Sequence, residues 1–181
     1  MTVEDPGARK IDKEALDDLF SATYEELRRL AASVRRNDPS ATLNPTALVN
    51  EAYMRLAGSL RMMPDSPLHF KRIAARAMRQ VLVDAARRRA AQKRGGAIAL
   101  VTFDESLDAN LTSSQEVLAL DAALDDLARM EPRQAQLVEY RFFGGLDLAE
   151  TAMLLEVSES TAARDWRAAR AWLAVELRRV S

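Results

Sequence analysis

Cysteine is absent from the 181-residue chain, and histidine occurs once, at His69. Without cysteine there is no disulfide, no thiolate nucleophile and no cysteine ligand for zinc, and one histidine excludes a zinc site built from histidines. A glycine-rich phosphate loop is also absent, and adjacent acid pairs such as Asp17 and Asp18 diverge by about 100° around a helix. We therefore expect no enzymatic activity, no metal and no cofactor.

Long apolar runs are missing as well. No segment approaches the roughly 20 apolar residues that a membrane span requires. The polar start MTVEDPGARKIDKE lacks the hydrophobic segment of a signal peptide. With 48% hydrophobic and 29% charged residues, the composition is typical of a globular protein. We expect a cytoplasmic protein without membrane insertion.

Glycine and proline are scarce, at six residues each, whereas alanine, leucine, arginine and glutamate abound. These four residues are good helix formers, so the sequence predicts an all-α fold. Apolar residues at helical spacing predict helices over residues 12–36, 45–58, 68–92 and 115–130. Further helices are predicted to begin at Pro132, after Asp147 as N-cap, and at 159 with Ser158 as N-cap, the last running to about residue 180.

Residues 97–114 lack sustained periodicity, and we place a boundary there. The sequence thus predicts two small helical domains, over residues 10–96 and 115–181, joined by an acidic linker over 97–114.

Charge is strongly segregated, although the net charge is only −1. Nine Lys or Arg residues and one acid, Asp84, lie between Lys71 and Arg94, whereas seven acids and no base lie between Val101 and Asp126. The basic segment indicates polyanion binding, with an ordinary solvated helix face as the alternative. Asp84 is also spaced to pair with Arg87 or Arg88. The basic and acidic segments could pair with each other, which the sequence alone leaves open.

The stretch DLAETAMLLEVSESTAARDWRAARAWL predicts a helix, a tight turn and a second helix. In a DNA-binding helix-turn-helix the second helix enters the major groove, and its first turns reach base edges. Arg164 has the forked donor geometry that guanine accepts, and an ordinary helical hairpin is the alternative. Trp166 and Trp172 fall at core positions of the pattern. The candidate DNA-contacting residues are Glu159, Ser160, Thr161, Arg164, Asp165 and Arg167.

This stretch, following the block HFKRIAARAMRQVLVDAARRRAAQKRGG, resembles the extracytoplasmic-function (ECF) sigma factors of bacterial RNA polymerase over residues 12–180. The resemblance is closest to the subgroup whose second domain ends in a run like VDAARRRAAQKRGG. It implies a promoter-specificity subunit whose partners are core RNA polymerase and promoter DNA. The third helix and its flank would bind the minus-ten element, and the last helix the minus-thirty-five element.

The resemblance also implies roles for individual residues. The helix matching ALVNEAYMRL would dock on the polymerase clamp. Its docking face would consist of Leu48, Glu51, Ala52, Arg55 and Leu56. The residues that would bind the minus-ten element and its phosphates are Arg79, Gln80, Arg87, Arg88, Arg89, Lys93 and Arg94.

One departure from the family precedes the docking helix. Relatives carry an acidic patch resembling Asp-Ala-Glu-Asp there, whereas this chain reads NPTA over residues 44–47. Thr46 stands where the family has glutamate, and phosphorylation would add about −1.5 to −2 charges at pH 7. We hypothesise that a Ser/Thr kinase activates the protein at Thr46. The alternative is that Thr46 is only a capping hydroxyl at an ordinary helix start, with control by a partner such as an anti-sigma factor or by the abundance of the protein.

The sequence leaves a second function open. A helix-turn-helix transcription regulator would also end in a DNA-binding helix pair, with an N-terminal domain that dimerises or senses a ligand. The basic end of the predicted third helix argues against a regulator, because a sensing domain has no need of a second DNA-binding surface.

Overall fold

The computed structural model describes residues 13–35, 45–59, 64–92 and 114–180. Within these ranges the chain forms seven α-helices and no β-strand. The helices are α1 (Lys13–Arg35), α2 (Pro45–Ser59), α3 (Pro67–Gln92), α4 (Ser114–Met130), α5 (Pro132–Gly144), α6 (Leu148–Leu154) and α7 (Glu159–Val180). The all-α prediction is confirmed, and the predicted bounds agree with the structure to about one residue.

Local signals explain where these helices begin and end. Pro45 and Pro132 occupy first helical positions, where a missing N–H costs nothing. Asp147 caps α6 by accepting a hydrogen bond from the Glu150 backbone N–H at 2.7 Å, and Ser158 caps α7 by accepting one from Thr161 N–H at 3.2 Å. Both predicted caps are confirmed.

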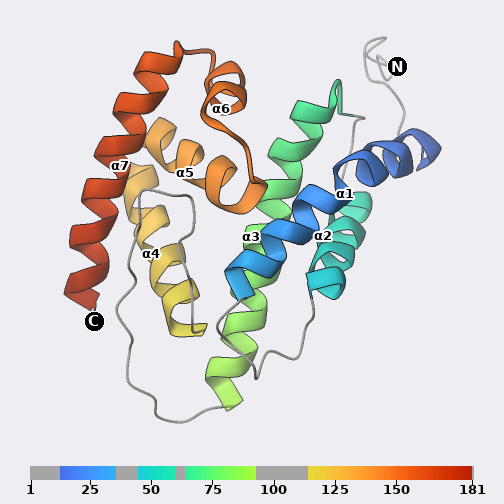
Figure 1. Ribbon diagram of the computed structural model, residues 1–181. Coiled ribbons are helices and arrows are strands. Elements are labelled where there is room, and N and C mark those ends of the chain that lie inside the picture. Colours follow the sequence, from blue (N-terminus) through green and yellow to red (C-terminus); the bar gives the residue numbers. More distant parts are fainter. Residues whose placement is uncertain (1–12, 36–44, 60–63, 93–113, 181) are drawn as a thin grey trace, which may run out of the picture.

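Helix α3 occupies the centre of the molecule (Figure 1). Helices α1 and α2 pack on one side of it, and α4 and α5 pack on the other, with α7 beyond them. Helix α3 is therefore covered over most of its surface, while Arg76 and Gln80 in its middle turns are exposed. Its buried apolar residues are Phe70, Ala74, Ala75, Ala77, Met78, Val81, Leu82, Val83, Ala85 and Ala86.

One hydrophobic core connects helices from both halves of the chain. It joins Leu27 of α1 and Leu56 of α2, through Met78 of α3, to Leu124 of α4 and Leu173 of α7. The predicted linker, residues 97–114, lies outside the described residues except for Ser114. The helices assigned to two domains therefore pack against each other in this structure.

Candidate nucleic-acid interface

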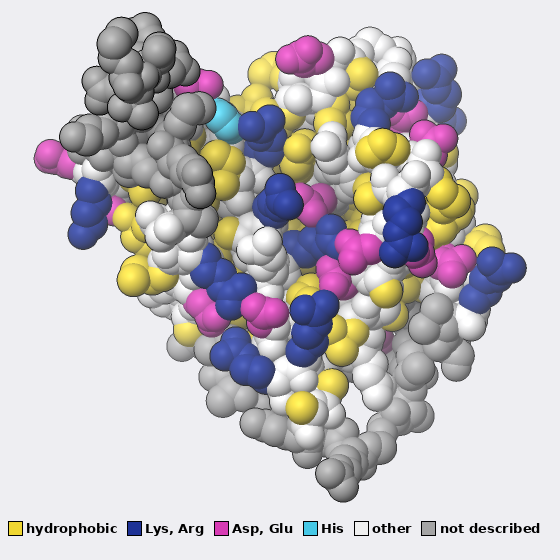
Figure 2. Space-filling model, turned by 180° about the vertical axis from the view of Figure 1, so that it is seen from behind, with side chains coloured by type: hydrophobic (Ala, Val, Ile, Leu, Met, Phe, Trp, Pro, Cys, Tyr) yellow, Lys and Arg dark blue, Asp and Glu magenta, His cyan; other side chains and the backbone are white. Residues whose placement is uncertain are grey.

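The C-terminal end of α3 presents part of the predicted cationic surface. The side chains of Arg87 and Arg88 are 65% and 61% exposed. Arg89 is half-buried, and its Nη1 donates to Ser114 Oγ at 3.5 Å. Lys93 and Arg94 lie outside the described residues. Figure 2 shows Lys and Arg side chains interleaved with Asp and Glu side chains along the middle of one face, so the cationic surface has acidic neighbours.

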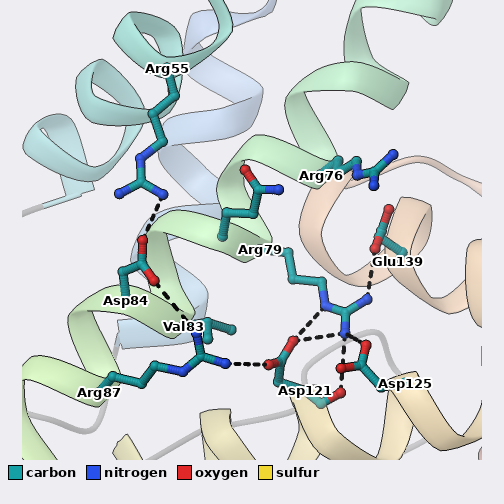
Figure 3. A pocket seen from close by; sticks show the side chains of 10 residues that line it. Arg55, Arg76, Arg79, Val83, Asp84, Arg87, Asp121, Asp125 and Glu139 are labelled. Atoms are coloured by element: carbon teal, nitrogen blue, oxygen red, sulfur yellow. Dashed lines mark hydrogen bonds and ion pairs between the residues drawn. The ribbon is translucent and has the colours of Figure 1, made fainter. Parts of the chain in front are cut away.

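Carboxylates surround Arg79, which the resemblance assigns to the minus-ten element. Its side chain is only 15% exposed. Nε donates to Asp121 Oδ1 at 2.8 Å, Nη2 to Asp125 Oδ1 at 2.6 Å and Nη1 to Glu139 Oε2 at 2.9 Å (Figure 3). Burial lowers the pKa of Arg79, but the bonds to Glu139 and Asp121 outweigh it and raise the pKa above its ordinary value. The guanidinium is therefore charged and fully engaged, whereas the neighbouring Gln80 is exposed.

Ion pairs continue from α2 across α3 to α4. Arg55 of α2 lies 2.7 Å from Asp84, and Arg87 lies 3.8 Å from Asp84 and 3.6 Å from Asp121. The predicted pairing of Asp84 with Arg87 is confirmed, but its shortest ion pair is with Arg55 on another helix. Together with Arg79, these residues line an open cavity of about 380 Å³ (Figure 3).

The five predicted polymerase-docking residues divide between the core and the surface. Leu48, Ala52 and Leu56 are buried, because this side of α2 packs against α1 and α3. Glu51 and Arg55 are half-buried and lie 3.3 Å apart. In this packing the three apolar residues stabilise the fold and present no surface to a partner.

The outward side of α2 is formed by other residues. Thr46, Asn50 and Met54 are exposed and follow one another at four-residue spacing, which places them on one helix face. Met54 is 69% exposed, an unusual environment for a large apolar side chain.

Helices α6 and α7 meet through a tight turn. Glu156 in this turn adopts a left-handed conformation, with φ of 54°, and Val157 N–H donates to Ala152 O at 3.0 Å. Thr151 and Ala152 of α6 and Ala162 of α7 are buried where the two helices pack. Small side chains allow this close approach, and the pair forms the helix, turn and helix that the sequence predicts.

The first turns of α7 carry the predicted base-contacting residues. Glu159, Ser160, Arg164 and Arg167 are exposed, and Thr161 is half-buried. Asp165 is instead buried.

Asp165 Oδ2 accepts a hydrogen bond from Arg133 Nε at 2.7 Å. This bond, with the nearby carboxylate charge, raises the pKa of Arg133. The carboxylate of Asp165 therefore positions Arg133 of α5.

Trp166 packs against the core as predicted, and so does Trp172. The Arg141 guanidinium lies 4.5 Å from the centroid of the Trp166 ring, a cation–π distance. Burial, which outweighs the attraction of Asp147, lowers the pKa of Arg141. The indole thus joins α5 to α7 behind the exposed surface.

Two contacts that join the two halves of the chain were not predicted. These are the carboxylates around Arg79, and Lys71, whose Nζ lies 2.6 Å from Glu26 Oε2 and 3.0 Å from Glu150 Oε1. The Asp165–Arg133 pair, within the C-terminal half, was not predicted either. The segregation of basic and acidic segments was a sequence signal only for the pairing of Arg79 with Asp121 and Asp125. It suggests attraction but does not specify partners.

Across the described ranges, no group of three or more His, Cys, Asp or Glu side chains is arranged to hold a metal ion. In the same part of the chain, none of the helices has the length and apolar character needed to cross a bilayer.

A basic helix end and a helix-turn-helix with exposed arginines, carried on an all-helical fold, define a DNA-binding protein. The chain belongs to the ECF sigma factor family, since the model of that family matches residues 8–179. No match was found among curated proteins or among solved structures. Members of this family direct RNA polymerase to promoters and are not enzymes, so core RNA polymerase and promoter DNA are the partners of this chain.

Proposed function

We propose that the protein is a two-domain promoter-specificity subunit whose binding to core polymerase is controlled by phosphorylation of Thr46. Residues 10–96 bind the polymerase and the minus-ten element, residues 97–114 form the linker, and residues 115–181 read the minus-thirty-five element. The observation that carries this proposal is the pair of exposed cationic surfaces, at the end of α3 and at the start of α7, in one chain that matches the family throughout.

The basic end of α3 captures the minus-ten strand. Strand separation exposes a flexible polyanion, and its phosphates bind arginines with release of counterions. The exposed guanidiniums of Arg87 and Arg88, next to Gln80, suit this role. The proposed contacts to the minus-ten strand also include Arg79, Arg89, Lys93 and Arg94.

The start of α7 reads the minus-thirty-five element in the major groove. Glu159, Ser160, Thr161 and Arg164 offer donors and acceptors to base edges, and Arg167 lies one turn on. Asp165 acts indirectly, because its carboxylate is buried and holds Arg133. Arg133, half-exposed at the start of α5, is then available for a phosphate.

Helix α2 docks on the polymerase through its outward side. Glu51 and Arg55 contribute polar contacts, and the exposed Met54 supplies the apolar centre that interfaces favour. Thr46 lies two turns before Met54 on the same face. A modification of Thr46 would therefore lie within the docking surface itself.

Phosphorylation of Thr46 supplies the charge that this surface lacks. Helix α2 has no acidic residue in its first turn, and Thr46 is exposed. The N-terminus of a helix favours an anion by about 0.3–1 kcal/mol when exposed. A phosphothreonine would therefore be stabilised there and would stand where relatives carry acids.

The affinity of core polymerase for the unmodified protein, Thr46→Glu and Thr46→Ala tests this function. We expect the glutamate variant to bind at least about tenfold more tightly than the other two, the order of one charge-assisted hydrogen bond. Ser160→Glu is the matched control, because it adds the same charge near the start of α7 and should leave the affinity unchanged.

Equal affinities of all three proteins would show that control lies elsewhere. Failure of every variant to bind core polymerase, with DNA binding retained, would contradict the docking role itself.

A further inference from the structure

We propose that the free protein is autoinhibited by an acidic latch, Asp121, Asp125 and Glu139, which occupies Arg79 in place of promoter DNA. The inference rests on the proposed function, because it takes Arg79 as a contact for the minus-ten strand.

The latch satisfies the guanidinium in every direction. Carboxylates bind Nε, Nη1 and Nη2, and Nη2 also donates to the Asp121 carbonyl at 3.1 Å. Arginine recognises carboxylates and phosphates through the same forked donors. The three side chains therefore offer Arg79 the anionic oxygens that a DNA strand would offer, and DNA must displace them.

Close packing of α5 against α3 holds the latch in place. A Cβ atom placed on Gly144 would lie 2.6 Å from Leu146 Cδ1, the end of a flexible side chain, and 2.9 Å from Ala75 Cβ. The end of α5 therefore approaches α3 at a distance that only glycine permits. Ala75, Arg79, Val83 and Arg87 recur every four residues and therefore share one face of α3. This face touches α5 at Gly144, and its last three residues line the cavity with the latch carboxylates.

The closed arrangement is incompatible with binding both promoter elements at once. The minus-ten and minus-thirty-five elements lie about 25 base pairs apart, or roughly 85 Å at 3.4 Å per base pair. A compact chain of this length has a diameter of only about 40 Å. The 18 residues of the proposed linker can extend to about 60 Å. Once separated, the two halves can therefore bind both promoter elements, which the closed body cannot do.

Opening must separate α4 and α5 from α3, and this separation frees Arg79. Arg87 links the latch to α2, because it contacts both Asp121 and Asp84, and Asp84 also pairs with Arg55. Docking of α2 on the polymerase would compete for Arg55 and so weaken the latch from its other end. Autoinhibition and polymerase binding are thereby coupled.

Lys71 provides an internal reporter of closure. Its amine contacts Glu26 of α1, within the N-terminal half, and Glu150 of α6, in the C-terminal half. A water-soluble carbodiimide joins such contacting amine and carboxylate pairs as amides, which mass spectrometry identifies after digestion. The ratio of the Lys71–Glu150 product to the Lys71–Glu26 product measures closure in a folded protein.

The opening variant is Asp121→Asn/Asp125→Asn/Gly144→Ala, which neutralises two latch carboxylates and adds a methyl group against Ala75 and Leu146. The matched control is Asp126→Asn/Glu176→Gln/Gly58→Ala. It removes two charges outside the latch, and the added Cβ at Gly58 meets no atom within 4 Å. Both are full-length chains, and circular dichroism verifies their helix content.

We expect the crosslink ratio of the opening variant to fall roughly tenfold relative to the control. Its affinity for a mixed-sequence single-stranded 20-mer should rise about tenfold at fixed salt, the order expected for one or two added phosphate contacts. Arg79→Ala in the opening variant should remove most of this gain. If the opening variant is less helical, Asp121→Asn/Asp125→Asn alone, which adds no atoms, should show the same changes at about threefold.

An unchanged crosslink ratio, or an oligonucleotide affinity equal to that of the control, would overturn the latch. So would a gain in affinity that survives Arg79→Ala. The crosslink ratio involves neither polymerase nor promoter, so its failure is distinct from failure of the proposed function, which would appear as absent binding to core polymerase.

Discussion

Met54 and Leu56 are two residues apart on α2 but face opposite environments. Met54 is 69% exposed and Leu56 is buried. Met54→Glu keeps good helix propensity, so we expect the free energy of unfolding to change by no more than about 0.5 kcal/mol. Affinity for core polymerase should fall at least about tenfold, as for loss of a central apolar contact. Urea unfolding and titration with polymerase measure the two effects.

Two further variants serve as controls for Met54→Glu. Met153→Glu changes an equally exposed methionine on α6 and should leave polymerase binding intact. Leu56→Glu buries a carboxylate and should unfold the protein. If Met54→Glu binds polymerase as tightly as Met153→Glu, the outward side of α2 is not the docking surface.

Lys71 gives the protein a specific response to alkaline pH. Burial lowers its pKa, but the bonds to Glu26 and Glu150 outweigh burial and raise the pKa above 10.5. A raised folded-state pKa means that the protonated amine stabilises the fold fully below the unfolded pKa of about 10.4. That stabilisation is lost as pH rises through the folded pKa. Urea midpoints of the wild type should therefore fall above about pH 10.5.

The Lys71→Met variant isolates this contribution. It has no amine to titrate, so its midpoint should already be lower at pH 9 and should fall less at higher pH. Lys13→Met, at an exposed position of α1, should keep the full wild-type response. A Lys71→Met profile parallel to the wild type would contradict the assignment.

At the scale of single elements, α6 is too short to be stable alone and depends on its capping box. Asp147 accepts from Glu150 N–H, and Glu150 Oε2 accepts from Asp147 N–H at 2.9 Å. Asp147→Ala should lower the free energy of unfolding by about 1 kcal/mol. It should also weaken DNA binding, because α6 and the turn position α7.

Asp147→Asn, which retains a capping oxygen, should restore most of the loss. Urea unfolding and DNA titration of both variants provide the comparison. Equal loss in Asp147→Ala and Asp147→Asn would mean that the charge, and not the cap, is what matters.

The helix bounds were predictable because the residues that start a helix act locally. Pro45, Pro132, Asp147 and Ser158 mark helix starts by their own covalent geometry or hydrogen bonding, and each was identified from the sequence. Which side chains are buried and which are exposed was harder to predict from the sequence. Asp165 lies among exposed neighbours in the sequence pattern, and its burial depends on Arg133, 32 positions earlier.

At the scale of the whole molecule, the sequence reveals opposite charges in two segments but not how they meet. Arg79 and Glu139 are 60 positions apart, and no spacing rule relates them. The available signal was the spread of apolar residues around α3, since Ala75 and Val83 lie next to α5 and α4, and an isolated three-helix domain would leave them in water. Placement of the two halves therefore required the structure.

The shared core makes a final prediction about folding. Trp166 and Trp172 both lie in α7, so tryptophan fluorescence reports the C-terminal half, whereas far-ultraviolet circular dichroism reports all helices. If the halves are one cooperative body, the two signals give the same urea midpoint, the test of a two-state transition. The opening variant, with the halves separated, should show midpoints that differ, and its matched control should not. Distinct midpoints in the wild type would mean that the contacts across α3 contribute too little to couple the halves.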